Sequence, residues 1–596
     1  MSIDTFRKDE KTTTVSRRDT LTRLFSYLLK YMGPIIGVLL IMAVTIGISV
    51  INPLLIERAI DVYIANKDVK GLIKLAIFGA SINLAFVLLV KLRMYIMAVV
   101  SNKILLDIRK ELYEHIQTLS FQFFDSRPTG KILARVIGDV NSLKKVLSDS
   151  VTTLIPDFIT ICAVVVIMFV KDARLAAAAL SSLPIMIVGI WCVMKRSQKA
   201  WQIFRKKGSN LNAFVHENLS GIRVVKSLTA EQETKDTFSE LVDQHEKSFQ
   251  KAVVVADTIG PIIDFCWGMG TMVLFFVGIV VLGINEVSVG ILVAFGNYIW
   301  MFWSPVLNVS NFYNQLVTNL AGAERIFEIL DTKPDIVDRN DVIELPEVEG
   351  AITFDKVSFS YDEGTSAETK VLNEVSFSVK PGETIALVGP TGAGKSTIVN
   401  LISRFYDIQK GHIYVDGYDL QDISMESLRN QMGVMTQDNF LFSGTVEDNI
   451  RYGKLDATKE EIINAAKAVN AHSFIMQMEN GYDTQLKERG AGLSIGQRQL
   501  IAFARTMVSM PKILILDEAT SSIDTKTELL VQQGIEVLLK GRTSFVIAHR
   551  LSTIQKADRI FVIDNGGIVE EGNAKELLEK KGQYYNLYMA QFKNVS

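Results

Sequence analysis

Hydrophobic positions are distributed very unevenly along this chain. Six long and almost uncharged runs all fall within the first 315 or so residues. Each run approaches or exceeds the roughly 20 helical residues that cross a hydrocarbon core, and buried helices of soluble proteins rarely stay uncharged over that length. The pattern therefore predicts six membrane-spanning helices, at 32–56, 75–90, 155–170, 175–194, about 257–284 and about 289–312.

Basic residues are concentrated in the N-terminal segment and in the connections after the second and fourth runs. By the positive-inside rule these segments face the cytoplasm. We therefore expect a multi-pass protein of the cytoplasmic membrane with both termini in the cytoplasm. A signal peptide is not expected, because about 30 polar residues precede the first apolar run. The basic residues are Arg7, Lys8, Lys11, Arg17, Arg18, Arg23, Lys30, Lys103, Arg109, Lys110, Arg127, Lys131, Lys195, Arg196, Lys199, Arg205, Lys206 and Lys207.

The two long cytoplasmic connections exceed the usual length of a loop without secondary structure. In the first of them, Ile104, Ile108 and Leu112 recur at helical spacing, which predicts that the spans continue as helices into the cytoplasm. Spacing alone leaves open whether the tips of these extensions only end a stalk or dock onto the second half of the chain. The expected tips are 120–130, with Phe123, Phe124, Asp125, Pro128 and Gly130, and 211–221, with Phe214, Glu217, Asn218 and Gly221.

Several side chains inside the runs are unusual for a membrane. A charge there is costly unless it faces a cavity or a partner, although charges near the inner ends of the helices also reach the cytoplasmic surface. Tryptophans either line a pocket for apolar compounds or form an interfacial belt, which is the commoner role. The charges are Lys91, Arg93, Asp157 and Asp264, and the tryptophans are Trp267, Trp300 and Trp303.

After about residue 325 the pattern changes to that of a soluble α/β protein. A charged linker containing Pro334 and Pro346 is followed by short apolar or alternating stretches, with Gly364 and Pro381-Gly382 at the turns. Such stretches predict β-strands. They are 352–359, 371–379 and 384–388.

A glycine-rich loop directly follows the strand at 385–388 and precedes a helical pattern at 397–405. It has the complete Walker A form in the strand–loop–helix context that this motif requires. Its glycines let backbone N–H groups converge on phosphate oxygens, while Lys395 is expected to reach the β and γ phosphates and Ser396 to hold Mg²⁺. The expected ATP-binding residues here are Gly389, Pro390, Thr391, Gly392, Ala393, Gly394, Lys395, Ser396 and Thr397.

A second motif supports this interpretation. Ile513–Leu516 is a continuous apolar run typical of a buried parallel strand, and it ends in Asp517 and Glu518. We expect Asp517 to contact the Mg²⁺ shell and Glu518 to orient the water that attacks the γ phosphorus. The alternative, a charge pair at a helix N-terminus, is less favoured once the Walker A motif lies upstream.

With these motifs, almost the whole chain, from about Leu21 to Phe592, resembles the ATP-binding cassette transporters. Six spans followed by one cassette resemble the exporter branch with long intracellular helices, in which the cytoplasmic tips are coupling helices. The resemblance implies a segment at 1–30, a transmembrane domain at 31–325, a linker at 326–350 and a nucleotide-binding domain at 351–596. It also implies that Tyr361 stacks on adenine, that Gln437 belongs to the glutamine loop and contacts Mg²⁺, and that His549 is the switch histidine. The signature residues are Ser494, Gly496 and Gln497. The D-loop is Ser521–Asp524, in which Asp524 is implied to contact the nucleotide.

Six spans are half of the family's usual twelve, so the resemblance implies a dimer in which each ATP lies between one chain's Walker A and the other chain's signature. The third signature position is Ile495 where the family has glycine. A β-branched residue there restricts the backbone and adds bulk near a phosphate. We therefore favour a heterodimer with one degenerate ATP site, while a homodimer that tolerates Ile495 stays open.

Composition narrows the function classes. The chain is 48% hydrophobic and 21% charged with a net charge of -2, which argues against disorder and against nucleic-acid binding. Its three cysteines lie in apolar runs, so neither a disulfide framework nor a cysteine metal site is expected.

Together these features predict an ATP hydrolase that exports amphipathic, drug-like compounds by alternating access. The alternatives are a lipid flippase, a peptide exporter, a homodimeric multidrug exporter and a weakly hydrolysing regulatory subunit, against which Glu518 argues. A soluble ATPase acting on DNA is excluded by the six spans, and import is disfavoured because spans and cassette are fused in this order.

Overall fold

The computed structural model describes residues 17–283, 286–339, 341–361, 369–436, 439–517, 525–547 and 551–592. These residues form two compact units. The first lies within residues 17–117 and 129–332, and the second within 118–128 and 333–592. We describe each unit separately.

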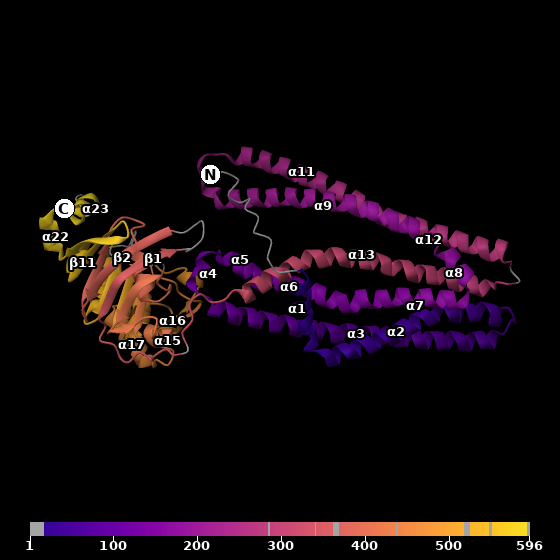
Figure 1. The fold of residues 1–596 in the computed structure, drawn as a ribbon, viewed down its shortest axis with the longest axis horizontal. Helices are drawn as coiled ribbons and strands as arrows, with labels where there is room; N and C mark the ends of the chain where they lie inside the picture. The colour runs from indigo at the N-terminus through magenta and orange to yellow at the C-terminus, as the bar shows by residue number, and fades with distance from the viewer. Residues whose placement is uncertain are drawn as a thin grey trace. The chain divides into compact units, whose positions relative to one another are not determined.

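The first unit is entirely helical (Figure 1). Among its described residues, six helical stretches are long and apolar enough to cross a membrane, which confirms the six expected spans. The principal helices are α1 (Arg17–Leu29), α2 (Met32–Arg58), α3 (Val69–Thr118), α6 (Val140–Asp149), α7 (Ile155–Lys171), α8 (Ala173–Ala179), α9 (Leu183–Ser220), α11 (Glu231–Asp257), α12 (Ile259–Phe276) and α13 (Val289–Asp331). Shorter pieces are α5 (Thr129–Leu133), α10 (Ile222–Ser227) and the π-helical turns η2 (Ala59–Ile64), η3 (Ala134–Asp139), η4 (Ser150–Leu154) and η5 (Val277–Val281).

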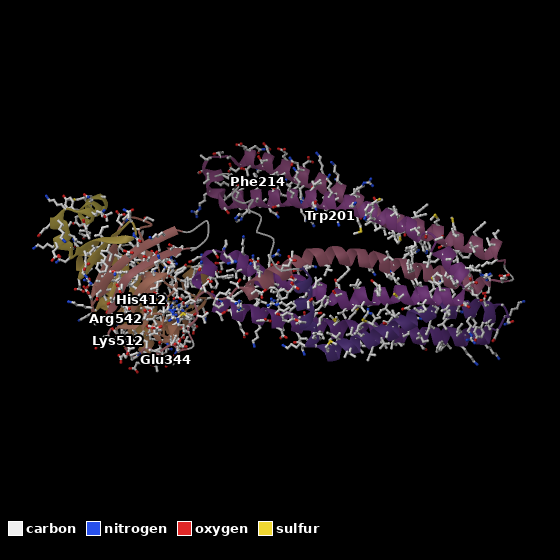
Figure 2. All side chains as sticks on the ribbon, in the orientation of Figure 1. Trp201, Phe214, Glu344, His412, Lys512 and Arg542 are labelled. Atoms are coloured by element: carbon white, nitrogen blue, oxygen red, sulfur yellow. The ribbon has the colours of Figure 1, made fainter. Side chains whose placement is uncertain are left out.

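The predicted extension of the spans into long helices is confirmed. Helix α3 is continuous over 50 residues, and its second half buries Ile104, Ile108 and Leu112 on one face. Helices α9 and α11 run side by side (Figure 1). The stacked rings of Phe204 and His245, 4.5 Å apart, join these two helices. Trp201, labelled on α9 in Figure 2, adds an edge contact to Phe204 at 5.4 Å.

The second cytoplasmic tip differs from the expected position. Helix α9 continues to Ser220, so Phe214, Glu217 and Asn218 lie within it, and the Asn218 side chain donates to the Phe214 carbonyl at 2.9 Å. The turn follows at Gly221, and α10 with the residues up to Ala230 connects α9 to α11. The expected turn at 211–221 therefore lies too early, because a polar side chain that bonds its own helix backbone is compatible with continued helix.

Helix α13 is central to the first unit. It packs against α2, α6 and α7. Tyr298 on α13 is fully buried and donates to the Val50 carbonyl of α2 at 2.8 Å. This hydrogen bond satisfies the one polar group of a large buried side chain, as a low-dielectric interior requires.

The second unit contains two larger sheets. An antiparallel sheet has the strand order β2-β1-β4-β5, and a mainly parallel sheet has the order β12-β11-β3-β10-β9-β6. The strands are β1 (Ile352–Tyr361), β2 (Thr369–Val379), β3 (Thr384–Val388), β4 (Lys410–Val415), β5 (Tyr418–Asp419), β6 (Met432–Met435), β7 (Gly444–Thr445), β8 (Gln485–Leu486), β9 (Ile513–Asp517), β10 (Thr543–Ile547), β11 (Arg559–Asp564) and β12 (Gly567–Gly572). All five residues of β3 and of β10 are buried, as expected for parallel strands covered on both faces.

Helices cover these sheets and connect their strands. With the sheets they form the α/β cassette expected from the sequence. They are α4 (Phe121–Asp125), α14 (Lys395–Ile402), α15 (Met425–Arg429), α16 (Val446–Arg451), α17 (Lys459–Ala468), α18 (His472–Ile475), α19 (Ile495–Val508), α20 (Thr525–Leu539), α21 (Leu551–Lys556), α22 (Ala574–Lys580) and α23 (Gln583–Phe592), with 3-10 turns at η6 (Gly481–Asp483) and η7 (Glu488–Gly490).

Helix α17 begins with a reciprocal pair of hydrogen bonds. The Glu461 N–H donates to the Thr458 hydroxyl at 3.3 Å, and the Glu461 carboxylate accepts from the Thr458 N–H at 2.7 Å. Lys454 also donates to this carboxylate at 2.7 Å. The Lys454 hydrogen bond, followed by those from Thr458, lowers the pKa of Glu461 from 4.5 to about 2.

A carboxylate with a lowered pKa in the folded chain stabilises the fold above its ordinary pKa, and this stabilisation is lost as the pH falls through the folded value. For Glu461 the window runs from 4.5 down to about 2. We expect Glu461→Gln to loosen the first turn of α17 at pH 7, as acid does in the wild type. Hydrogen exchange of residues 458–468, corrected for intrinsic rates, measures this. Glu460→Gln in the same turn is the control, and equal protection in both variants contradicts the assignment.

Candidate functional site

The glycine-rich loop connects the end of β3 to the start of α14. Gly389 has φ +151°, and a Cβ at this position would lie 2.1 Å from the carbonyl oxygen of Ile563. Gly394, with φ +108°, is the residue that precedes the first turn of α14. Only glycine suits these two places, because one lacks space and the other has a left-handed backbone conformation. The loop therefore leads directly to a helix N-terminus, where N–H groups and the helix dipole favour an anion.

Lys395 lies across this loop. Its Nζ donates to the carbonyl oxygens of Gly389 at 2.8 Å and of Pro390 at 2.7 Å. Burial lowers the pKa of the Lys395 ammonium, and the negative charge of Asp517 partly opposes this shift. The ammonium is thus held close to the loop by backbone oxygens, and the Asp517 carboxylate acts on it electrostatically.

Strand pairing explains why Lys395 and Asp517 are close. Strand β10 lies between β3 and β9, and its residue Ile547 pairs with Leu387 on one side and with Asp517 on the other. Parallel strands end at the same edge of a sheet, and neighbouring strands are about 4.8 Å apart. Asp517 therefore lies at the edge from which the loop after β3 departs, two strands away.

Tyr361 is held in an aromatic cluster at the end of β1. Its ring meets the edges of Phe359 at 4.8 Å and of Tyr406 at 5.1 Å. Its hydroxyl lies 3.3 Å from the hydroxyl of Thr397 on α14. A cleft of about 380 Å³ adjoins these rings. Tyr361 is therefore held next to α14, the helix that follows the glycine-rich loop.

The predicted signature residues start α19. The Ser494 hydroxyl accepts from the Gln497 N–H at 3.2 Å, and the Ser494 N–H donates to the Gln497 side-chain oxygen at 3.0 Å. Gly496 is buried, whereas Ile495 keeps 39% of its side chain exposed at the first helical residue. The bulky residue that replaces the family's glycine therefore stands at the surface of this helix start.

Four predicted site residues, Gln437, Glu518, Asp524 and His549, lie outside the described residues. Three of them follow a described strand in the sequence: Gln437 comes after β6, Glu518 after β9 and His549 after β10. The carboxyl ends of these three strands are adjacent in the sheet.

Residues 118–128, which contain most of the first expected tip, belong to the same compact unit as the cassette. In this unit Phe121 of α4 stacks on Phe405 with ring centres 4.3 Å apart. Ser120 donates to Asp335 at 2.8 Å, and the Tyr406 hydroxyl donates to Asp125. Sequence reasoning missed Phe405 and Tyr406, because no local pattern shows which side chains a distant segment will contact.

Comparisons with known proteins agree with this geometry. Residues 35–306 match the family described as the ABC transporter transmembrane region, and residues 372–521 match the ABC transporter family. An uncharacterized ABC transporter ATP-binding protein, YknV of Bacillus subtilis (strain 168), is 40% identical over 575 residues, which cover 96% of this chain and 94% of the relative. The chain belongs to the ATP-binding cassette (ABC) transporters.

Other similarities place it among the ABC exporters. An ATP-dependent lipid A-core flippase of Syntrophus aciditrophicus (strain SB) is 40% identical over 501 residues, covering 84% of this chain and 82% of the relative. A provisionally named multidrug export ATP-binding/permease protein of Staphylococcus aureus (strain NCTC 8325 / PS 47) is 36% identical over 589 residues, which cover 96% of this chain and 100% of the relative. The solved structure of a bacterial Atm1-family ABC exporter with ATP bound is similar, with a TM-score of 0.78 and 27% identity. The similarity covers 95% of this chain and 99% of that structure's chain.

The ABC exporter assignment covers the architecture and the reaction class. Six long apolar helices are fused ahead of an α/β ABC nucleotide-binding domain, so the chain is a half-transporter. Its reaction is ATP hydrolysis coupled to transport. ABC exporters function as dimers, so a second subunit is required.

Within the spans of this half-transporter, the unusual side chains have different surroundings. Asp157 on α7 accepts a hydrogen bond from Asn308 on α13 and interacts electrostatically with Arg93 on α3. Lys91 and Asp264, in contrast, are exposed. The polar positions thus separate into one cluster across three helices and two exposed charges.

The three tryptophans within the spans also differ in their exposure. Trp303 is only 1% exposed and packs edge-on against Phe302 at 4.9 Å, so it is a core residue. Trp267 and Trp300 are partly exposed and lie edge to face 5.9 Å apart, which joins α12 to α13. Trp303 is therefore removed from the candidates for lining a substrate pathway.

The glycine at the start of the loop provides a stability test. Gly389→Ala places a methyl group against the Ile563 carbonyl, so we expect a loss of about 2–4 kcal/mol in unfolding free energy. Gly392→Ala is the matched control, since its φ of +84° is unfavourable but no atom lies within 4 Å of the new Cβ. Its expected loss is about 1–2 kcal/mol. Thermal unfolding of the purified protein without nucleotide measures the loss of stability in both variants. A larger loss in Gly392→Ala than in Gly389→Ala contradicts the packing argument.

Proposed function

We propose that this chain is one half of an exporter that moves amphipathic, drug-like compounds out of the cytoplasm across the cytoplasmic membrane. The observation that carries the proposal concerns α4, which follows the long helix α3 that continues from the second span. Helix α4 packs into the same unit as the ATP-binding cassette, where Phe121 stacks on Phe405. A change in the cassette then moves the end of a helix that continues from a span. The name of the Staphylococcus aureus relative supports the multidrug cargo.

A lipid flippase is the second candidate, supported by the Syntrophus aciditrophicus relative named as a lipid A-core flippase. Its cargo is also amphipathic, so both functions use a pathway with polar and apolar parts. A peptide exporter and a homodimeric multidrug exporter are the remaining alternatives.

For the nucleotide we propose that adenine stacks on Tyr361, a contact worth about 1–3 kcal/mol in related sites. The phosphates lie in the loop Gly389–Thr397, where N–H groups at the start of α14 and the Lys395 ammonium favour their negative charge. The exposed hydroxyl of Ser396 and the carboxylate of Asp517 are oxygen donors of the kind that Mg²⁺ prefers, and Gln437 is the third proposed ligand.

For hydrolysis we propose that Glu518 orients the attacking water and accepts its proton, while His549 donates to the γ phosphate. Ser494, Gly496, Gln497 and Asp524 are the proposed contacts to the nucleotide held by the partner's loop. We also propose that both termini and the cassette lie in the cytoplasm, which the basic segments described above support through the positive-inside rule.

The cargo is tested with the complex reconstituted in proteoliposomes. We expect ATP-dependent transport and several-fold stimulation of hydrolysis by amphipathic drugs, and little response to lipid A or to peptides. Glu518→Gln should remove most turnover while nucleotide binding is kept, which separates transport from passive leakage. Stimulation by lipid A alone would favour the flippase, and turnover unchanged in Glu518→Gln would remove the proposed role of Glu518.

The partner is tested by expressing the chain alone. We propose a heterodimer, because Ile495 is exposed at the start of α19, where the family resemblance implies contact with a nucleotide bound by the partner. Alone, the chain should hydrolyse ATP slowly, and Ile495→Gly should raise the rate at least several-fold by removing the side chain from the contact. Ile495→Val, which keeps the β-branch, is the control. A stable homodimer with full hydrolysis and transport contradicts the heterodimer.

A further inference from the structure

Gln499 lies in the second turn of α19, behind the carboxyl ends of β6 and β9. The residue is only 6% exposed, and its side-chain oxygen Oε1 is buried without a hydrogen-bond partner in the part of the chain that the structure describes. Buried amide oxygens nearly always accept a hydrogen bond from protein or from ordered water, because an unmade bond inside a protein is costly. The isolated oxygen therefore requires an explanation.

A small pocket provides one. Gln499 lines it together with Thr436, Asn439 and Asp517, and the remaining lining is apolar. The pocket leaves about 20 Å³ for the centre of a water molecule. One water needs roughly 10–15 Å³ of such space and two to four polar partners, so this pocket meets both conditions, whereas purely apolar cavities stay dry.

The polar lining comes from three different elements. Thr436 follows β6 directly, Asp517 ends β9, and the paired residues Met435 and Leu516 place these two ends side by side. Gln499 comes from α19, four residues after the exposed Ile495. A water in the pocket thus has donors and acceptors from the start of one helix and from the two strand ends next to it.

We propose that one buried water, held by Gln499, Thr436 and Asp517, ties the signature helix α19 to the ends of β6 and β9, and that Gln499 is a positioning residue for ATP hydrolysis. This inference rests on the proposed role of Asp517. A nucleotide bound by the partner and contacting the start of α19 then displaces Gln499, and the water transmits that displacement to Asp517. The two ATP sites of the dimer are coupled through this contact.

The test uses the reconstituted complex with the Gln499→Met variant, which keeps the length of the side chain but removes its amide. Groups that orient a metal-binding carboxylate change activity by about 10–100-fold, so we expect kcat for ATP hydrolysis to fall about tenfold. The KM for ATP and the melting temperature should stay near the wild-type values. The control is Gln533→Met on α20, an exposed glutamine hydrogen-bonded to Asn470, which should leave kcat unchanged.

A double-mutant cycle separates a shared water from independent packing effects. Thr436→Val should also lower kcat, and the double variant Gln499→Met/Thr436→Val should be no slower than the slower single variant, because both remove the same water. The proposal would be overturned if the fold-losses in kcat of the two single variants multiplied in the double variant, or if kcat were unchanged in Gln499→Met. If Gln499→Met does not fold, a high-resolution structure of the wild-type dimer decides: density for a water at Gln499 Oε1 supports the proposal and a dry pocket overturns it.

The Asp517→Asn variant distinguishes failure of the proposed water link from failure of the proposed role of Asp517 in hydrolysis. Loss of hydrolysis in Asp517→Asn with normal hydrolysis in Gln499→Met overturns only the water link. Normal hydrolysis in both variants removes the proposed role of Asp517 as well.

Discussion

The parallel pairing of β10 with both β3 and β9 is the interaction on which the arrangement of the candidate site in this half-transporter depends. Strands β3 and β9 are more than a hundred residues apart in sequence, and the fully buried β10 holds both in register. Because parallel strands end at one edge, this pairing places the loop containing Lys395 and the carboxylate of Asp517 at the same edge. The resulting charge interaction partly offsets the burial of the Lys395 ammonium.

The membrane imposes a different constraint on the first unit. Backbone polar groups in hydrocarbon must be hydrogen-bonded within the protein, so each span has to be helical. Helix α3 contains no glycine or proline after Gly79, and it continues unbroken to Thr118 beyond the apolar run. A helix is stiff along its axis, which suits an element that connects a span to α4.

Much of the cassette was predictable because its signals are local. The strands that form β1, β2, β3 and β9 were identified from short apolar or alternating runs, and the glycine-rich loop from its motif and context. The second cytoplasmic tip was misplaced for an equally local reason. Asn218 and Glu217 resemble turn residues in sequence, but Asn218 bonds the Phe214 carbonyl and α9 continues to Ser220.

Other parts of the site depend on contacts that no spacing encodes. Tyr406 contacts both Tyr361 and Asp125, three residues from three separate segments. The side-chain oxygen of Gln499, which has no hydrogen-bond partner among the described residues, lines a pocket with Thr436 and Asp517 from the ends of β6 and β9. Likewise, α13 buries Trp303 while Trp300, one turn earlier, stays exposed beside Trp267.

The sequence by itself determined the six spans, the α/β cassette and the glycine-rich loop between β3 and α14, because hydrophobic periodicity and glycine requirements act over a few residues. Only the tertiary structure decided which side chains surround Tyr361, which tryptophan is buried and where Gln499 points. These outcomes depend on packing between distant segments, and burial of a side chain is a property of its neighbours in space and not of its neighbours in the chain.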